Sequence, residues 1–193
     1  NKSTIIQYVP ARCFEGKTTS CEPVPKTLDA AVVDWLQYLG VASSVKSKDQ
    51  GKFGHELKVR IGDEAQLEDL THVGVGVSQV LPILVMSLLA KADSTLIFEQ
   101  PELHLHPKVQ TRLGDFFLSM IALNKQCIVE THSEYLINRL RLRTAAAEGE
   151  AKWLERIRVY FVQRSEEGST FRDVRINEYG AILDWPEGFF DQS

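Results

Sequence analysis

The stretch TLIFEQPELHLHP, residues 95–107, begins as a short apolar strand and ends in an acidic loop that is rich in proline and histidine. It lies between two helix candidates: the apolar run 78–91 and the amphipathic segment 107–123, which opens with a proline as helices often do. A second buried strand, QCIVETH (126–132), follows, and then a helix over 133–149 with Ser133 as its predicted N-cap. This alternation predicts an α/β fold with a mainly parallel sheet flanked by helices.

The rest of the chain is less regular. The segment 27–40 has apolar residues at helical spacing, residues 55–61 alternate as a strand does, and residues 1–27 and 43–54 show the composition of loops. Two further strands are predicted toward the C-terminus, before a tail that carries Trp185, Phe189 and Phe190, which we expect to pack against the sheet. We therefore expect a small β-rich C-terminal extension, with its strands at 156–164 and 169–176.

Composition excludes several classes of protein. The chain has 193 residues, of which 44% are hydrophobic and 25% charged, so it has the composition of a globular domain. The net charge of -4 shows no overall basic character, and no apolar run is long enough to span a membrane. Three cysteines, without paired C-x-x-C spacing, favour a reducing, cytoplasmic setting over a disulfide framework. Because the chain starts at Asn1, we expect a piece of a longer protein.

Polar residues follow both apolar strands at the point where each strand ends. Glu99 and Gln100 follow the first strand, and Thr131 and His132 follow the second. Parallel sheets bind ligands at the carboxyl ends of their strands, where carboxylates hold Mg²⁺ in many nucleotide enzymes and an imidazole donates to a phosphate oxygen. The alternative is a solvated strand end. His104 and His106 do not supply the three or four ligands of a zinc site.

A glycine loop, VGVGVSQVL, precedes the helix at 78–91. Gly74 and Gly76 make the loop pliable, and we expect Ser78 to cap the helix. Free N–H groups at a helix N-terminus form an anion site, so the loop predicts phosphate binding. An ordinary glycine turn with a serine cap is the alternative.

Taken together, these three motifs resemble those of ABC-type ATPase heads of the SMC/RecF/OLD-like AAA family. VGVGVSQ is similar to the signature loop, LIFEQPELHLHP to the Walker B strand and D-loop, and IVETHS to the switch-histidine loop. The segment RINEYGAILDWPEGFFDQS resembles a short C-terminal domain of unknown function found in a bacterial subset of that family. The resemblance implies a P-loop NTPase fold, with residues 1–69 as the end of an arm, 70–150 as the ATPase head and 151–193 as the extension.

The resemblance also implies roles for individual residues. Ser78, Gln79 and the two glycines, Gly74 and Gly76, would contact ATP bound to a partner subunit. Glu99 would support Mg²⁺ and His132 would be the switch histidine, while Leu105, His106 and Pro107 would lie in the D-loop near a dimer interface. The implied cofactors are ATP and Mg²⁺, and the implied partners are a second copy or a related head, with DNA or an effector protein as further candidates.

The sequence departs from the family pattern at Gln100, where a catalytic glutamate is usual. A glutamine orients water but does not accept a proton as a carboxylate does. Slow hydrolysis, a base supplied by Glu102, or an ATP-sensing role all remain open. We therefore expect either an ATPase linked to DNA repair or phage defence, or a non-hydrolysing interaction module with an ATPase-head fold.

The sequence also contains no complete P-loop pattern for binding phosphate. ARCFEGKT (11–18) has the final Gly-Lys-Thr but Ala11 in place of the first glycine, and the prolines at 23 and 25 follow where a helix should begin. We interpret it as an ordinary loop and expect the true P-loop upstream. The tail lacks the close acidic pair of a fused nuclease. The basic run RLRLR (139–143) fits either phosphate contacts or a solvated helix face.

Overall fold

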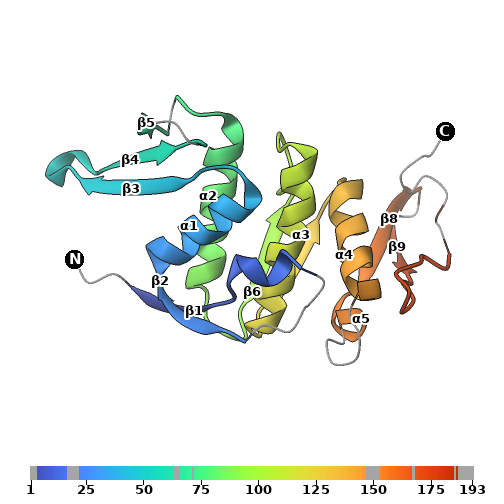
Figure 1. Cartoon of the computed structure of the whole chain (residues 1–193). Coiled ribbons are helices and arrows are strands. Elements are labelled where there is room, and N and C mark those ends of the chain that lie inside the picture. Colours follow the sequence, from blue (N-terminus) through green and yellow to red (C-terminus); the bar gives the residue numbers. More distant parts are fainter. Residues whose placement is uncertain are drawn as a thin grey trace.

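The computed structural model describes residues 4–16, 22–62, 66–70, 72–146, 153–166, 168–184 and 186. The helices are α1 (Leu28–Leu39), α2 (Val75–Leu89), α3 (Pro107–Ala122), α4 (Glu134–Ala146) and α5 (Trp153–Arg156), with short 3-10 helices η1 (Ala11–Phe14) and η2 (Gly51–Phe53). The strands are β1 (Ile5–Tyr8), β2 (Val24–Thr27), β3 (Ser44–Asp49), β4 (His55–Arg60), β5 (Glu68–Asp69), β6 (Thr95–Glu99), β7 (Gln126–Glu130), β8 (Val159–Ser165) and β9 (Gly168–Val174). Figure 1 shows the helices in the middle of the molecule, with β3–β5 at one end and β8–β9 at the other.

The predicted α/β fold is confirmed, and its parallel part is the pair β6–β7. These strands run parallel in the register Glu99↔Glu130, with α3 as the crossover between them. The third predicted parallel strand, β8, instead pairs antiparallel with β9. The turn between Ser165 and Gly168 is too short for anything but a hairpin, because a parallel connection needs a crossover of a dozen residues or more. Within the described residues, the parallel sheet therefore has two strands.

The two faces of β6–β7 differ in burial. Phe98 and Val129 face the core, and Phe98 packs on Phe117 of α3 with ring centroids 5.1 Å apart. Side chains alternate along a strand, so Ile97 and Ile128 share the opposite face, where they are 76% and 51% exposed. One face of the parallel pair is thus covered by α3 and the other is open.

One hydrophobic core joins the N-terminal segment to the predicted ATPase part. Trp35 of α1 is fully buried and meets Phe116 of α3 edge to face, with ring centroids 5.1 Å apart. Residues of η1 and α1 share this core with residues of α2, α3 and α4, including Leu84, Leu113 and Leu136. Aromatic pairs of this geometry contribute about 1 kcal/mol beyond the area that they bury.

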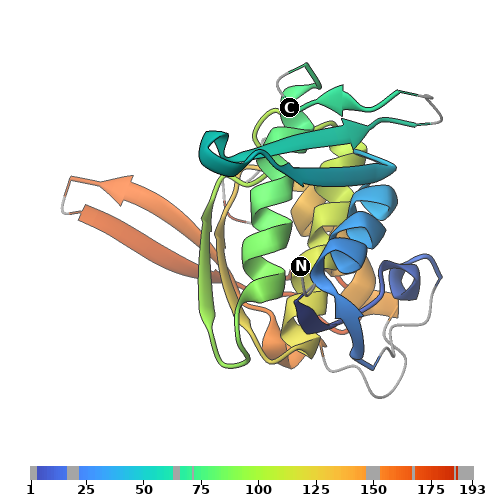
Figure 2. The ribbon, with the colours of Figure 1, turned by 90° about the vertical axis from the view of Figure 1, so that its left-hand side faces the viewer.

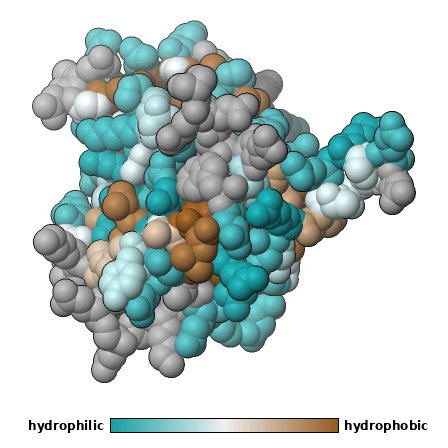
Figure 3. Space-filling model, turned by 90° about the vertical axis from the view of Figure 1, so that its right-hand side faces the viewer, coloured by the Kyte–Doolittle hydropathy of each residue, from teal (hydrophilic) through white to brown (hydrophobic). Residues whose placement is uncertain are grey.

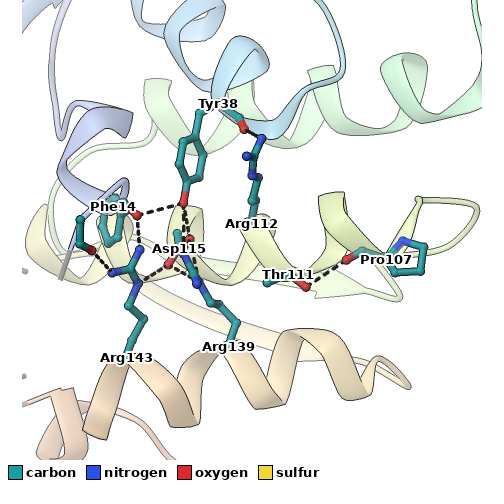
Figure 4. Close-up of polar contacts among 9 residues, drawn as sticks. Phe14, Tyr38, Pro107, Thr111, Arg112, Asp115, Arg139 and Arg143 are labelled. Atoms are coloured by element: carbon teal, nitrogen blue, oxygen red, sulfur yellow. Dashed lines mark hydrogen bonds and ion pairs between the residues drawn. The ribbon is translucent and has the colours of Figure 1, made fainter. Parts of the chain in front are cut away.

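A buried ionic cluster lies beside this core (Figure 4). Asp115 of α3 has no exposed surface, and its carboxylate accepts from Arg139 (2.7 Å) and Arg143 (2.8 Å) of α4 and from the Tyr38 hydroxyl of α1 (2.5 Å). Arg143 also donates to the carbonyls of Phe14 and Gly16. The run RLRLR is therefore not a solvated helix face, because Arg139 and Arg143 point inward.

The C-terminal hairpin β8–β9 is built as predicted and projects from the body (Figure 2). Val159 and Val174 at its base pack on Ile137 of α4 in a second, small core. On the face seen in Figure 3 the surface is mostly hydrophilic, with hydrophobic residues near the centre and smaller groups of them elsewhere. The predicted packing of Trp185, Phe189 and Phe190 falls outside the described residues.

Two sequence predictions in the first half are wrong. Residues 1–27 contain β1 and β2, which pair antiparallel, and residues 43–54 contain β3, which pairs with β4 from Ser44↔Arg60 to Asp49↔His55. Polar, exposed two-sided strands lack the apolar alternation that marks a strand, so their pairing is set by long-range hydrogen bonds that composition does not report.

The cysteines also differ from expectation. Cys13 is disulfide-bonded, whereas Cys127 is a free, half-buried thiol. Burial raises the pKa of Cys127 to about 11. That thiol is therefore protonated at neutral pH and a weak nucleophile.

Gly180 fixes the segment after the hairpin against α4. Its φ is +74°, its carbonyl accepts from Arg141 Nε at 2.8 Å, and a Cβ added to it would lie 2.5 Å from the Arg141 carbonyl oxygen. We expect Gly180→Ala to lower the free energy of unfolding by about 3 kcal/mol, since the left-handed conformation alone costs about 1–2 kcal/mol and the clash adds to it. Gly51→Ala, with φ +62° and open space around it, is the matched control and should lose only the conformational part. Equal losses in urea titrations of the two variants would show that the contact with α4 does not matter.

Tyr38 should make the fold sensitive to alkaline pH. Burial and the neighbouring Asp115 carboxylate raise the pKa of Tyr38 to about 12, above its ordinary value near 10. The stabilisation is complete below pH 10 and is lost as the pH rises toward 12, because the unfolded chain releases the proton first. The free energy of unfolding should fall by roughly 2–3 kcal/mol over that range from this group. Tyr38→Phe should remove that part of the slope in urea titrations at pH 9 to 12, and an unchanged slope would contradict it.

Candidate functional site

The candidate site lies at the carboxyl ends of β6 and β7. The two strands end side by side at Glu99 and Glu130, and both side chains are exposed. The Gln100 N–H donates to the Glu130 carbonyl at 3.0 Å, after which the backbone turns through a positive φ of 44° at Gln100. A non-glycine residue in this region is uncommon and requires support from its surroundings. The turn at Gln100 directs the chain away from the sheet immediately after Glu99.

His132 stands at the same edge. Its Nε2 lies 3.4 Å from Glu130 Oε1, and its side chain is 78% exposed. Its backbone, in contrast, is held: the His132 N–H donates to Glu102 Oε1 at 2.7 Å. The imidazole is therefore presented to solvent from an anchored loop, beside two carboxylates.

Glu102 has a different environment from the one expected of a catalytic base. The residue is only 7% exposed, one carboxylate oxygen is taken by the His132 N–H, and Oε2 is buried without a hydrogen-bond partner among the described residues. An uncompensated buried oxygen costs about 1–3 kcal/mol. This arrangement suits a side chain that positions the His132 loop better than one that activates water.

A second hydrogen-bond path ties the loops together, and sequence reasoning missed its central residue. Ser133 caps α4 as predicted, with its Oγ accepting from the Leu136 N–H at 3.1 Å, and the same hydroxyl donates to Gln110 Oε1 at 2.6 Å. The Gln110 amide in turn donates to the Leu105 carbonyl at 2.8 Å. Gln110 thus joins the loop after β7 to the loop after β6. A glutamine within an amphipathic helix gives no sequence signal for such a role.

The glycine loop meets this assembly through Leu105. Leu105 is 6% exposed, and a Cβ built on Gly76 would lie 3.5 Å from its Cδ2, an ordinary van der Waals contact. The N-cap of α2 is Gly74, not Ser78 as predicted. The Ser78 hydroxyl lies one turn into the helix, exposed, and donates to the Val75 carbonyl at 2.8 Å. Ser78 does not cap the helix because α2 starts three residues earlier, at Val75.

Gln79 and the two histidines of the His-Leu-His sequence complete the loops. Gln79 follows Ser78 on the first turn of α2, and its Oε1 is buried without a partner among the described residues. His106 is the N-cap of α3, with Nδ1 accepting from the Lys108 N–H at 3.2 Å, and His104 is exposed at a positive φ of 61°. The described residues contain no group of three or more His, Cys, Asp or Glu side chains that could hold a metal ion together.

The carboxylates of the site match the ligands that Mg²⁺ requires. Mg²⁺ is usually held by one or two carboxylates, with water and phosphate oxygens as the other ligands, and Glu99 and Glu130 meet that requirement. The described residues of the segment 11–18, namely 11–16, do not have the form of a phosphate cradle, since Ala11–Phe14 are a 3-10 helix and the Gly16 carbonyl accepts from Arg143. Lys17 and Thr18 lie outside the described residues.

The comparisons with known families show the class of protein to which this fold belongs. A family model described as an AAA ATPase domain matches residues 30–137, more than half of the chain, and the protein belongs to that AAA ATPase family. A second model, described as a protein of unknown function (DUF3696), matches residues 155–193. No curated protein sequence matches the chain.

Solved structures show the same fold. One, from work on ATP-driven dimerization and DNA-stimulated activation of SMC ATPases, superposes with a TM-score of 0.55 at 14% identity, covering 76% of this chain and 83% of that one. Another, an SmcHead bound to the C-winged helix domain of ScpA, gives 0.54 at 12% identity, covering 78% of this chain and 43% of that one. The described part of this chain has no helix of the length and hydropathy that crossing a bilayer requires.

Glu102 gives a test of how the His132 loop is held. Glu102→Ala removes the acceptor of the His132 N–H, so we expect faster hydrogen exchange at that amide, by about tenfold or more for a bond worth roughly 1.5 kcal/mol. Glu102→Gln keeps a carbonyl oxygen in the same place and should leave the exchange near the original rate. The measurement is amide exchange by NMR, with the Leu136 amide as an internal reference. Equal rates in all three proteins would show that Glu102 does not hold the loop.

Proposed function

We propose that the chain forms the signature, Walker B and switch-histidine part of an ABC-type ATPase head that dimerises around ATP and hydrolyses it slowly. One observation carries this proposal. The glycine loop, the loop after β6 and the loop after β7 are separate in the sequence but are connected in space. Leu105 lies beside Gly76, where an added Cβ would be 3.5 Å from Leu105 Cδ2. The Leu105 carbonyl accepts from the Gln110 amide, and Gln110 accepts from the Ser133 hydroxyl. Such a connection would transmit a displacement of any one loop to the other two.

Each side chain then has a proposed task. Glu99 would hold Mg²⁺, which would neutralise the phosphate charge, and His132 would donate to the terminal phosphate from its exposed position. Gln100 would orient the attacking water. Glu102 would fix the His132 loop through its backbone, which is a positioning task rather than a chemical one.

The first turn of α2 would serve a neighbouring subunit. The N–H groups at a helix start lack intrahelical partners and attract anions. Gly74 and Gly76 leave that end of α2 accessible to a phosphate, and the Ser78 hydroxyl is exposed beside it, with Gln79 next in the helix. We propose that these four residues contact the γ-phosphate of ATP held by a second copy or a related head. The phosphate cradle would come from a P-loop outside residues 1–193.

The alternative function is an ATP-sensing module without useful hydrolysis, and one observation favours it. The position of a catalytic glutamate is occupied by Gln100, and the nearest substitute in sequence, Glu102, is buried and engaged by His132. No free carboxylate is therefore placed to accept a proton except Glu99 and Glu130, which the metal would use. A role in DNA repair or phage defence, with DNA or an effector protein as partner, is proposed by analogy with the family alone.

Replacing Gln100 by glutamate tests both proposed functions. In the full-length protein at saturating Mg-ATP, we expect Gln100→Glu to raise kcat by at least tenfold, because a carboxylate adds general-base catalysis worth about 10²–10⁴. His132→Ala should lower kcat of both forms. The matched control is Gln126→Glu, the same change at the opposite end of the neighbouring strand, which should leave kcat unchanged.

The outcomes separate the two proposals. Activity that rises only with Gln100→Glu supports a slow ATPase. If neither form releases phosphate while both bind ATP, the enzyme proposal fails and the sensing module stands. If neither binds ATP, both proposals fail.

A further inference from the structure

A cleft on the helical side of the molecule shares no residue with the candidate site. It has a volume of about 660 Å³ and opens between η1, α1, α3 and α4. Sites for small molecules commonly have volumes of about 300–1,000 Å³, so the cleft is large enough for one. Figure 4 shows five of its residues, which come from η1, α1, α3 and α4: Phe14, Tyr38, Thr111, Arg112 and Arg139.

The cleft is positively charged in a chain whose net charge is -4. Four cationic side chains line it, against two carboxylates, Glu15 and Asp34. Asp34 is engaged within the fold, because its Oδ2 accepts from the Ala11 N–H at 2.9 Å. The cations are Arg12, Lys108, Arg112 and Arg139.

Two of these cations are held in place. Arg112 donates to the Tyr38 carbonyl and lies over the Tyr38 ring, with its guanidinium carbon 5.1 Å from the ring centroid. Arg139 is fixed by the buried Asp115, which it contacts at 2.7 Å. Each guanidinium retains N–H groups beyond those contacts, and a guanidinium that is already oriented loses less entropy when it binds an anion.

The other two cations are uncommitted. Arg12 on η1 and Lys108 on the first turn of α3 are exposed, and neither side chain makes a hydrogen bond or ion pair with the described residues. The neutral polar groups, in contrast, are used internally: Thr111 donates to the Pro107 carbonyl and Gln37 to the Ser43 carbonyl. The free hydrogen-bond donors of the cleft are therefore cationic, and the Glu15 carboxylate is the one free anionic group among its described lining residues.

The aromatic rings at the cleft offer no stacking surface. The Tyr38 ring is covered by Arg112, and the Phe14 ring has Arg143 over it, with the guanidinium carbon 5.4 Å from the centroid. A base or sugar would find little to recognise here, whereas phosphate oxygens match oriented guanidinium groups in pairs. We propose that this cleft binds the phosphate groups of a small oligophosphate-bearing molecule.

The test measures binding of inorganic tripolyphosphate to the full-length protein by calorimetry. We expect the double variant Arg12→Gln/Lys108→Gln to weaken binding at least tenfold, while leaving the melting temperature unchanged because both side chains are exposed and unpaired. The matched control is Arg164→Gln/Lys91→Gln, which removes the same charges at exposed positions outside the cleft. A nucleotide site formed with an upstream P-loop would keep its affinity in both double variants.

Three results would overturn the proposal. One is no measurable binding of tripolyphosphate at millimolar concentration. Another is the same loss in the control, which would indicate general electrostatic attraction. The third is competition by a single-stranded oligonucleotide that binds more tightly than tripolyphosphate and depends on the same two cations, which would make the ligand a nucleic-acid backbone.

Discussion

The burial of Asp115 is the constraint on which the helical part of the molecule depends. A carboxylate without any exposed surface is tolerable only when it is fully compensated, and here two arginines and a tyrosine do so. Its partners come from α1 and α4, and Arg143 extends the cluster to the carbonyls of Phe14 and Gly16. Removing any one partner would take a compensating hydrogen bond from the buried carboxylate, so the relative positions of these helices are fixed together. The cluster specifies one arrangement of the helices more than it adds net stability.

That arrangement gives the candidate site its rigid base. The loop after β6 leads into α3 and the loop after β7 leads into α4, so fixing the two helices fixes one end of each loop. The Ser133–Gln110–Leu105 path then sets the loops at hydrogen-bond distance. The exposed imidazole of His132 is thereby supported from behind by groups that do not contact a ligand, as preorganised sites require.

The sequence predicted the parts of this protein that depend on local pattern. The alternating helices and strands from residue 75 to 146 and the edge formed by Glu99 and His132 follow from apolar periodicity and from the rule for parallel sheets. The inward arginines, the role of Gln110 and the pairing of β3 with β4 did not follow. Each depends on a partner distant in sequence: Asp115 lies 28 residues from Arg143, and Gln110 lies 23 from Ser133. The roles of Gln100 and the glycine loop remain predictions.

The open face of β6–β7 has a consequence for handling the protein. Within the described residues the pair has no third strand, so each strand has an outer edge with unpaired N–H and C=O groups, next to the exposed Ile97 and Ile128. Such an edge is a template for adding strands from another chain. The protein is therefore expected to be lost from concentrated solutions by precipitation rather than by unfolding.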